Sequence, residues 1–164
     1  MSRRVTTAGM YLCYAVEATA GTRPTTGYKV VPEVKSAPSF NPTPEQIEST
    51  TLMETEFKTY EEGLKDLGGV LGFNANLTDD LVTFWGSVNT EFDTAAASSK
   101  AMWFALVHPK LSNAVFFTGD PAPIGLNEVN INAMAETTLY ITPTNAPALY
   151  AKPSLASGQT VLGN

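Results

Sequence analysis

Residues 69–88 read Gly69-Val-Leu-Gly-Phe-Asn-Ala-Asn-Leu-Thr-Asp-Asp-Leu-Val-Thr-Phe-Trp-Gly-Ser-Val88 and carry two periodic patterns in succession. In the first, Leu71, Phe73 and Ala75 alternate with polar or small residues, which is the period of a strand with one buried face. The second pattern repeats every three to four residues, which is typical of an amphipathic helix. A strand followed at once by a helix is therefore the starting point for the fold.

The expected helix has a defined beginning. Thr78 suits the N-cap position, and Asp79 and Asp80 fall in the first turn, where the helix dipole favours carboxylates. The apolar stripe consists of Leu81, Phe84, Trp85, Val88 and Phe92. Small residues at 95–99 end the helix, and no other segment of the chain predicts one.

The remaining periodic segments indicate strands. Residues 28–34 contain Pro32, which restricts them to an edge strand or an extended arm, and a proline-rich connector follows at 37–44. We expect a central hairpin from 101–107 and 114–118, because both runs are apolar on both faces. Further strands are predicted at 10–16, 46–52, 129–135 (half-exposed) and 137–142, with a rigid break at 119–123. The fold class expected is mainly β with one α-helix.

Composition indicates one domain over residues 1–164, with an N-terminal arm at 1–9 and a loosely held tail at 144–164. Only 16% of the residues are charged, and the net charge is −6. This acidity argues against a protein that grips nucleic acid. Cys13 is the one cysteine, predicted to be buried in a strand. No run of residues is long enough for a membrane span, and Glu17 argues against reading the N-terminus as a secretory signal.

Most of the charge lies in one short segment. Residues 45–66 hold seven acidic residues against Lys58 and Lys65, a net charge of −5. Residues 53–68 show no clean period, so we expect a long loop there. Long ordered loops in small domains usually bind something, and the segment therefore indicates contact surface.

No arrangement of residues indicates catalysis, a cofactor or a metal site. His108 precedes Pro109 at an expected surface turn, without a nucleophile nearby in sequence, and Asp79 and Asp80 are better explained by the helix dipole. The glycines at 63–72 lack phosphate-binding spacing. The aromatic residues predicted to lie in the core are Trp85, Phe92, Trp103, Phe104, Phe116 and Phe117. The sequence thus favours a binding or structural role over an enzyme.

Two runs in residues 31–69 resemble the major tail tube proteins of long-tailed, non-contractile bacteriophages. They are Val31-Pro-Glu-Val-Lys-Ser-Ala-Pro-Ser-Phe-Asn-Pro-Thr-Pro-Glu-Gln-Ile-Glu-Ser-Thr-Thr-Leu52 and Thr55-Glu-Phe-Lys-Thr-Tyr-Glu-Glu-Gly-Leu-Lys-Asp-Leu-Gly-Gly69. The likeness rests on a proline-bearing arm, then a strand, then a charged loop before a glycine-rich strand. Beyond Gly69 the likeness is one of layout.

This resemblance implies a β-sandwich or partly closed β-barrel with a flanking helix, assembled as hexameric rings that stack into a tube. Implied partners are further copies of the chain, a tape-measure protein, a tail terminator and distal tail proteins. DNA would pass through the tube without specific binding, and the protein would be assembled in the host cytoplasm and reside in the virion. Alternatives are a tube protein of a contractile or type VI-like system, and a non-enzymatic carbohydrate-binding or adhesin module.

Within that reading we expect the loop at 53–68 to reach the neighbouring ring. Phe57 and Tyr60 would act as apolar anchors, and lysines would pair with acids across the joint. The expected inter-subunit contact residues are Glu54, Phe57, Lys58, Tyr60, Glu61, Glu62 and Lys65.

Overall fold

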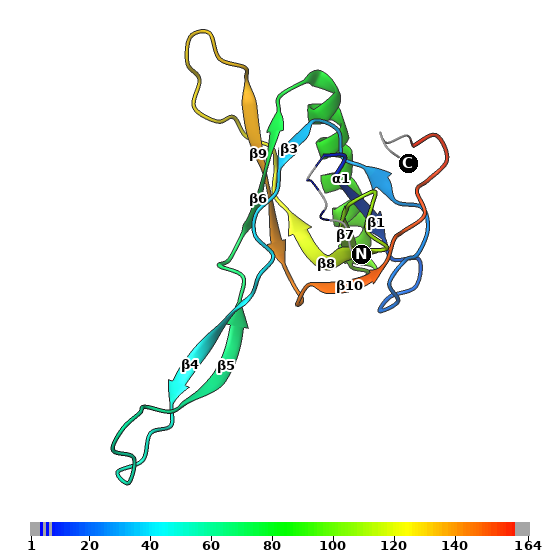
Figure 1. Ribbon diagram of the computed structural model, residues 1–164. Coiled ribbons are helices and arrows are strands. Elements are labelled where there is room, and N and C mark those ends of the chain that lie inside the picture. Colours follow the sequence, from blue (N-terminus) through cyan, green and yellow to red (C-terminus); the bar gives the residue numbers. More distant parts are fainter. Residues whose placement is uncertain (1–3, 5, 7, 160–164) are drawn as a thin grey trace.

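The computed structural model describes residues 4, 6 and 8–159 of the chain (Figure 1). One helix, α1, spans Asp79–Ala97. The strands are β1 Tyr11–Val16, β2 Lys29–Val30, β3 Val34–Ser36, β4 Thr43–Glu48, β5 Tyr60–Asp66, β6 Leu71–Asn76, β7 Met102–Val107, β8 Asn113–Pro121, β9 Glu136–Pro143 and β10 Ala148–Ala151. The predicted class, mainly β with one helix, is confirmed.

The main sheet curls back on itself. Its strands run β2-β1-β7-β8-β9-β6-β3, with β10 added to β8. β2 and β3 lie at the two ends of this order, although only residues 31–33 separate them in the chain. Backbone hydrogen bonds continue across that link, from Val31 N to Leu12 O (2.9 Å) and from Asn76 N to Glu33 O (3.0 Å). One extended segment therefore joins both edges, and the sheet forms a partly closed barrel (Figure 1).

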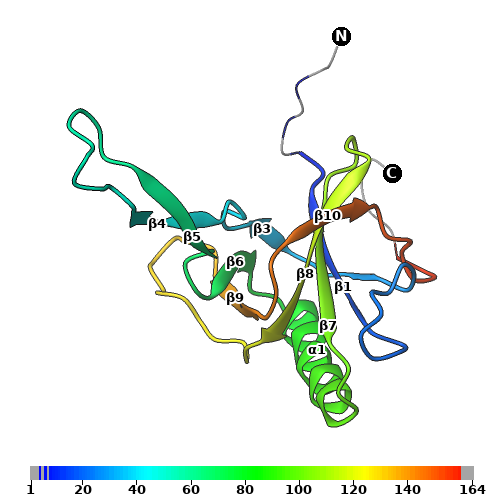
Figure 2. The same ribbon diagram turned by 90° about the horizontal axis from the view of Figure 1, so that it is seen from below.

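Helix α1 covers one face of this sheet and packs against β1 and β8 (Figure 2). The Thr78 hydroxyl caps it by accepting from Leu81 N at 3.2 Å, as expected. Leu81, Trp85 and Val88 are fully buried, and the Trp85 indole N–H donates to Ala122 O at 2.7 Å. Their sheet-side neighbours in the core are Leu12, Tyr14, Leu71, Phe73, Ala75, Met102, Phe104, Phe117, Leu139 and Ile141. The predicted stripe thus packs where the periodicity placed it.

A second, smaller core lies on the other face of β1, β7 and β8. Cys13 is buried there, as predicted, beside Tyr28 and Phe116. Two segments cover this core, one with Arg23 and the other with Tyr150 of β10. The Arg23 guanidinium lies over the rings of Phe116 (4.8 Å) and Tyr150 (4.3 Å), and these two rings contact each other edge to face. The described part of the expected loose tail is therefore held: β10 pairs with β8, and Leu155 bridges Tyr28. Residues 160–164 lie outside the described residues, as do most of those in the expected arm at 1–9.

Several expected elements differ from the structure. The break predicted at 119–123 is wrong, because β8 runs on to Pro121 and Gly119 pairs with Pro143. The strand predicted at 129–135 is a loop, since the alternating residues have no partner strand there. β4 covers 43–48 instead of 46–52, and β5 lies inside the expected loop at 53–68. His108 is buried rather than exposed, with Nδ1 accepting from Lys110 N and Nε2 against Thr6 O.

β8 and β9 approach so closely at Gly119 that there is little room for a side chain. A Cβ added there would lie 2.5 Å from Ile141 Cγ2 and 3.1 Å from Thr142 O, so Gly119→Ala is expected to destabilise the fold by about 1–3 kcal/mol. Gly86, inside α1, has open space around its Cα, and Gly86→Ala should stabilise by about 0.5–1 kcal/mol. Urea unfolding of both variants tests this pair. Equal midpoints for Gly119→Ala and the unaltered protein would contradict it.

Candidate inter-subunit surface

The strands β4 and β5 form a hairpin that leaves the curled sheet and projects away from it (Figure 1). Pro38 and Pro42 restrict the backbone of the connector that precedes the hairpin, and Pro44 lies in β4 opposite Lys65. Every residue of β4 is exposed, and in β5 only Gly63 is half-buried. A two-stranded hairpin in water is marginally stable by itself. Both faces of this one are therefore available for contact with another molecule.

A bulge lies near the base of the hairpin. Pairing runs from Thr43 opposite Asp66 to Glu48 opposite Tyr60, with a register shift at Glu45. Gly63 fits this point because a Cβ there would lie 3.1 Å from the Glu45 carbonyl oxygen. Beyond the shift, Tyr60 and Glu62 share one face and Glu61 lies on the other.

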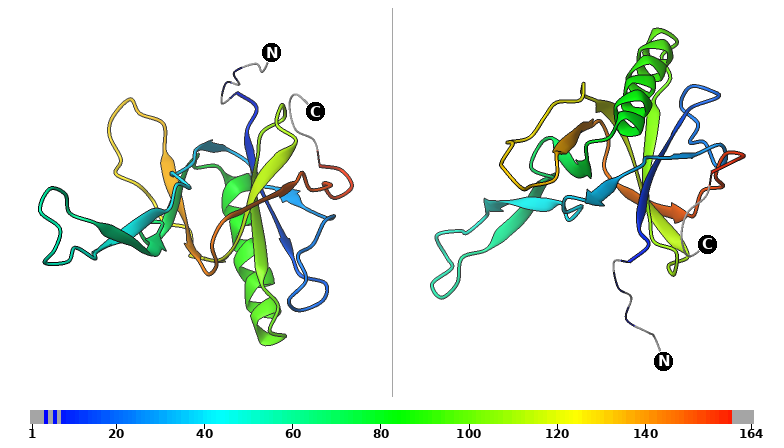
Figure 3. Two further views of the ribbon diagram at one scale, coloured as in Figure 1. Left: turned by 60° about the horizontal axis from the view of Figure 1, so that its bottom comes forward. Right: turned by 90° about the horizontal axis from the view of Figure 1, so that it is seen from above.

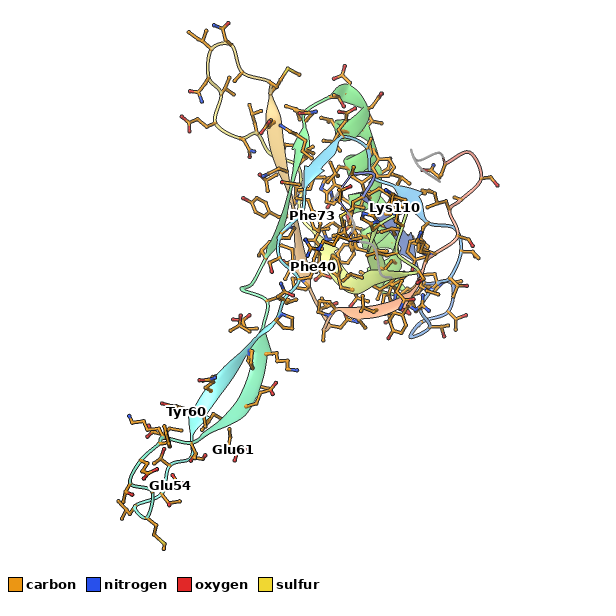
Figure 4. The ribbon with its side chains drawn as sticks, viewed as in Figure 1. Phe40, Glu54, Tyr60, Glu61, Phe73 and Lys110 are labelled. Atoms are coloured by element: carbon orange, nitrogen blue, oxygen red, sulfur yellow. The ribbon has the colours of Figure 1, made fainter. Side chains whose placement is uncertain are left out.

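The tip of the hairpin, residues 49–59, is organised by Glu54. Its carboxylate accepts from Thr51 N at 2.9 Å and from the Thr59 hydroxyl at 3.2 and 3.4 Å. Across the tip, Thr59 N donates to the Thr50 hydroxyl at 2.9 Å, and Ser49 N donates to Thr59 O at 2.9 Å. Figure 4 shows Glu54 at this end, far from Phe40 and Phe73 in the body. Glu54 therefore shapes the tip from within.

The hairpin carries more exposed apolar side chains than its polar sequence suggests. Phe57 is 80% exposed and Met53 is 91% exposed. The full apolar set of the hairpin is Ile47, Leu52, Met53, Phe57, Tyr60 and Leu64. Exposed apolar groups gathered on one projection mark an interaction surface. Of these six, sequence reasoning named only Phe57 and Tyr60; the apolar residues within an otherwise charged segment were a signal for the other four.

Both lysines of the hairpin pair with acids on the same hairpin. Lys65 Nζ lies 3.2 Å from Glu62 Oε1, and Lys58 Nζ lies 3.9 Å from Glu48 Oε1. All four side chains are more than half exposed or close to it, so each pair contributes little to stability. The structure thus places all seven predicted contact residues on one hairpin, and their contact with another molecule stays a prediction.

A second apolar projection lies at residues 122–135, between β8 and β9. Its base is fixed by the Thr137 hydroxyl, which donates to Gly125 O at 2.7 Å, and by Asn127 N, which donates to Glu136 O at 3.1 Å. The large apolar side chains exposed on it are Leu126, Val129, Ile131 and Met134. Figure 3 shows this loop and the hairpin as two separate projections from the body.

The described residues give no support for a metal site or a reactive thiol. Among the described residues, no three His, Cys, Asp or Glu side chains are placed to hold a metal ion. Burial raises the pKa of the Cys13 thiol to about 12, so this group is a poor nucleophile at neutral pH. Within the same residues, no helix has the length and apolar character that crossing a membrane requires.

Comparison with known proteins gives a fold relationship. No protein-family model matches the chain, and no curated protein does. A chain from the baseplate of the anti-feeding prophage, a six-fold symmetrised structure, superposes with a TM-score of 0.59 at 9% identity, covering 92% of this chain and 98% of that one. This chain shares its fold with that baseplate chain.

Two further solved structures agree with that relationship. A chain of the tube-terminating cap of the anti-feeding prophage gives a TM-score of 0.56 at 10% identity, covering 92% of this chain and 93% of that one. A chain from the tail of an empty gene transfer agent particle, refined with C6 symmetry, gives 0.55 at 11% identity, covering 90% and 100%. Sequence identity this low relates the folds alone.

The role of Glu54 can be tested separately from assembly. Glu54→Ala removes the carboxylate that joins Thr51 to Thr59, and the loss of about 1 kcal/mol of net hydrogen bonding should speed tryptic cleavage after Lys58 about fivefold. The thermal midpoint of the body should stay unchanged. Glu56→Ala is the matched control, because within the described residues the Glu56 side chain has no hydrogen bond or ion pair. Equal cleavage of the two variants would contradict this role.

Proposed function

We propose that this protein is a structural tail protein of a phage or phage-like particle, and that it polymerises as stacked hexameric rings into a tail tube. The observation that carries the proposal is the uncovered β4–β5 hairpin on a fold shared with components of six-fold tail particles. An exposed apolar projection of this kind is typical of a surface that contacts another protein. The role proposed is accordingly non-enzymatic.

Ring formation would use the strands of this fold that have an open edge. β10 is paired on one side only, by β8, and β3 is paired on one side only, by β6, within the described residues. Open edges of this kind are the usual places where strands of another chain add to a sheet. Six copies joined edge to edge would close the row of strands into a larger barrel.

The surface chemistry is compatible with a conduit for DNA. β6 and β9 together contain no lysine or arginine, and their face away from α1 carries Asn74, Thr138 and Tyr140. Six copies would carry a formal charge of −36, six times that of one chain. A basic lumen would hold phosphates and slow the passage of the duplex. A polar conduit whose strands carry no lysine or arginine would let DNA pass without specific binding.

The tube would enclose a tape-measure protein during assembly and would end on tail terminator and distal tail proteins. On this proposal the protein is assembled in the host cytoplasm and resides in the virion tail. The same geometry would also serve the tube of a contractile or type VI-like system.

A second candidate role is that of a terminal ring. It is favoured by two of the similar structures, which are a baseplate and a tube-terminating cap. A terminal protein forms one ring and stops, while a tube protein stacks without limit. A carbohydrate-binding module is less well supported, because four of the aromatic residues that the sequence offered for stacking on sugars, Trp85, Phe104, Phe116 and Phe117, are fully buried.

Purified protein is expected to form hollow rings or tubes of uniform width as its concentration rises. Negative-stain electron microscopy over a concentration series, with light scattering on the same samples, measures this. Long tubes would support the tube role, and single rings would support the terminal role. Monomers at every concentration, also in the presence of a tape-measure protein, would overturn both.

The double variant Phe57→Ala, Tyr60→Ala is expected to fold normally and to form no tubes, since both side chains are exposed and contribute nothing to the core. Val82→Ala is the control, because it trims an exposed apolar residue of α1 instead. Circular dichroism establishes folding, and microscopy scores assembly. Normal tubes from the double variant would remove the hairpin from the interface.

A further inference from the structure

The loop at 122–135 has an apolar surface that none of the residues described in the structure covers. Ile131 is 93% exposed, and Leu126, Val129 and Met134 are each at least 60% exposed. We call these four residues the loop surface. The base of the loop is held by hydrogen bonds to β9, including the Thr138 hydroxyl donating to Asn127 Oδ1 at 3.1 Å. The apolar groups are thus presented on an anchored projection.

The hairpin and the loop surface lie at opposite ends of the molecule along β6 and β9. These two strands are antiparallel. The hairpin enters the start of β6, and the loop enters the start of β9, so the two projections are at opposite ends of the strand pair. Figure 1 shows the hairpin at one end and the loop at the other. A stack of identically oriented copies would bring the hairpin end of one copy to the loop end of the next.

The charge distribution favours contact between a hairpin and a loop surface over contact between two hairpins. The hairpin region at 45–66 has a net charge of −5, whereas residues 122–135 contain a single charged residue, Glu128. Contact between two hairpins would bring like charges together and would be opposed. Contact between hairpin and loop surface avoids most of that repulsion. It is also a head-to-tail contact, which generates an open-ended stack rather than a closed dimer.

We propose that the loop surface receives the apolar hairpin tip, Leu52, Met53 and Phe57, of a second copy in the adjacent ring. This inference rests on the proposed function and names the partner of its hairpin. The contact buries apolar groups from both copies, so its strength comes mainly from the hydrophobic effect. The low charge of the loop surface suits that role, because charged residues are depleted at the centres of interfaces.

Disulfide cross-linking tests the pairing. Two single variants of the full chain, Met53→Cys and Ile131→Cys, are mixed under assembly conditions and oxidised. Native Cys13 is retained in both, because it is buried and its thiol does not take part. A cross-linked dimer is expected in the mixture and in neither variant alone. A chain carrying both substitutions should give a ladder of higher oligomers, as head-to-tail contact requires.

The outcomes separate this inference from the proposed function. Tubes seen by microscopy without a Met53→Cys to Ile131→Cys cross-link would overturn the pairing and leave the tube role standing. Cross-linked dimers of Met53→Cys alone would also overturn it, because they would show hairpin against hairpin. Absence of any assembly, with or without a tape-measure protein, would overturn the proposed function and this pairing together. Mixing Met53→Cys with Val82→Cys supplies the background of random collision, since Val82 is exposed on α1.

Discussion

The segment from β2 to β3 closes the main sheet, and the rest of the molecule is arranged around that closure. Residues 29–36 pair with β1 at one end and with β6 at the other, which forces the sheet to curl. The curl encloses the side chains that α1 covers, with Trp85 tied to Ala122 O at the start of the loop after β8. It also fixes where β3 ends. From Ser36 the proline-rich connector leads outward, and the hairpin is consequently built beyond the body.

Sequence patterns predicted secondary structure correctly where the residues pack against near neighbours or into the core. The Thr78 cap, the stripe through Leu81, Trp85 and Val88, and the alternation in β6 all depend on burial against near neighbours, and all are confirmed. Predictions failed where a segment becomes a strand only if another strand lies beside it. Residues 129–135 alternate like a strand, but no described strand lies beside them, and they form a loop. The segment of β10 was predicted to be part of a loose tail, but it pairs with β8. His108 was predicted at a surface turn, which is wrong: it is buried, and its Nε2 lies against Thr6 O, a partner remote in sequence.

The candidate surface was predicted in part. The charge density at 45–66 identified the hairpin region, since no core can absorb so many carboxylates. The strand β5 was not predicted, because a strand exposed on both faces has no alternation of hydrophobic and polar residues. Glu54 shows a further limit. Its sequence position suggested a contact across the joint, while its hydrogen bonds to Thr51 and Thr59 need the tip to be folded first.

The hairpin and the loop at 122–135 both expose apolar side chains, which favour assembly, while the acidic charge of the subunit opposes it. Burying a large apolar side chain contributes about 1.5–3 kcal/mol, so each hairpin tip favours association, but two free subunits also lose translational and rotational freedom when they bind. The net charge of −6 opposes this, because approaching copies repel one another before apolar groups meet. In the proposed ring, six hairpins are held in place together, and each contact raises the effective concentration of the next. Contacts too weak to hold two free subunits would then hold two rings, which makes the ring, rather than the single chain, the unit that stacks.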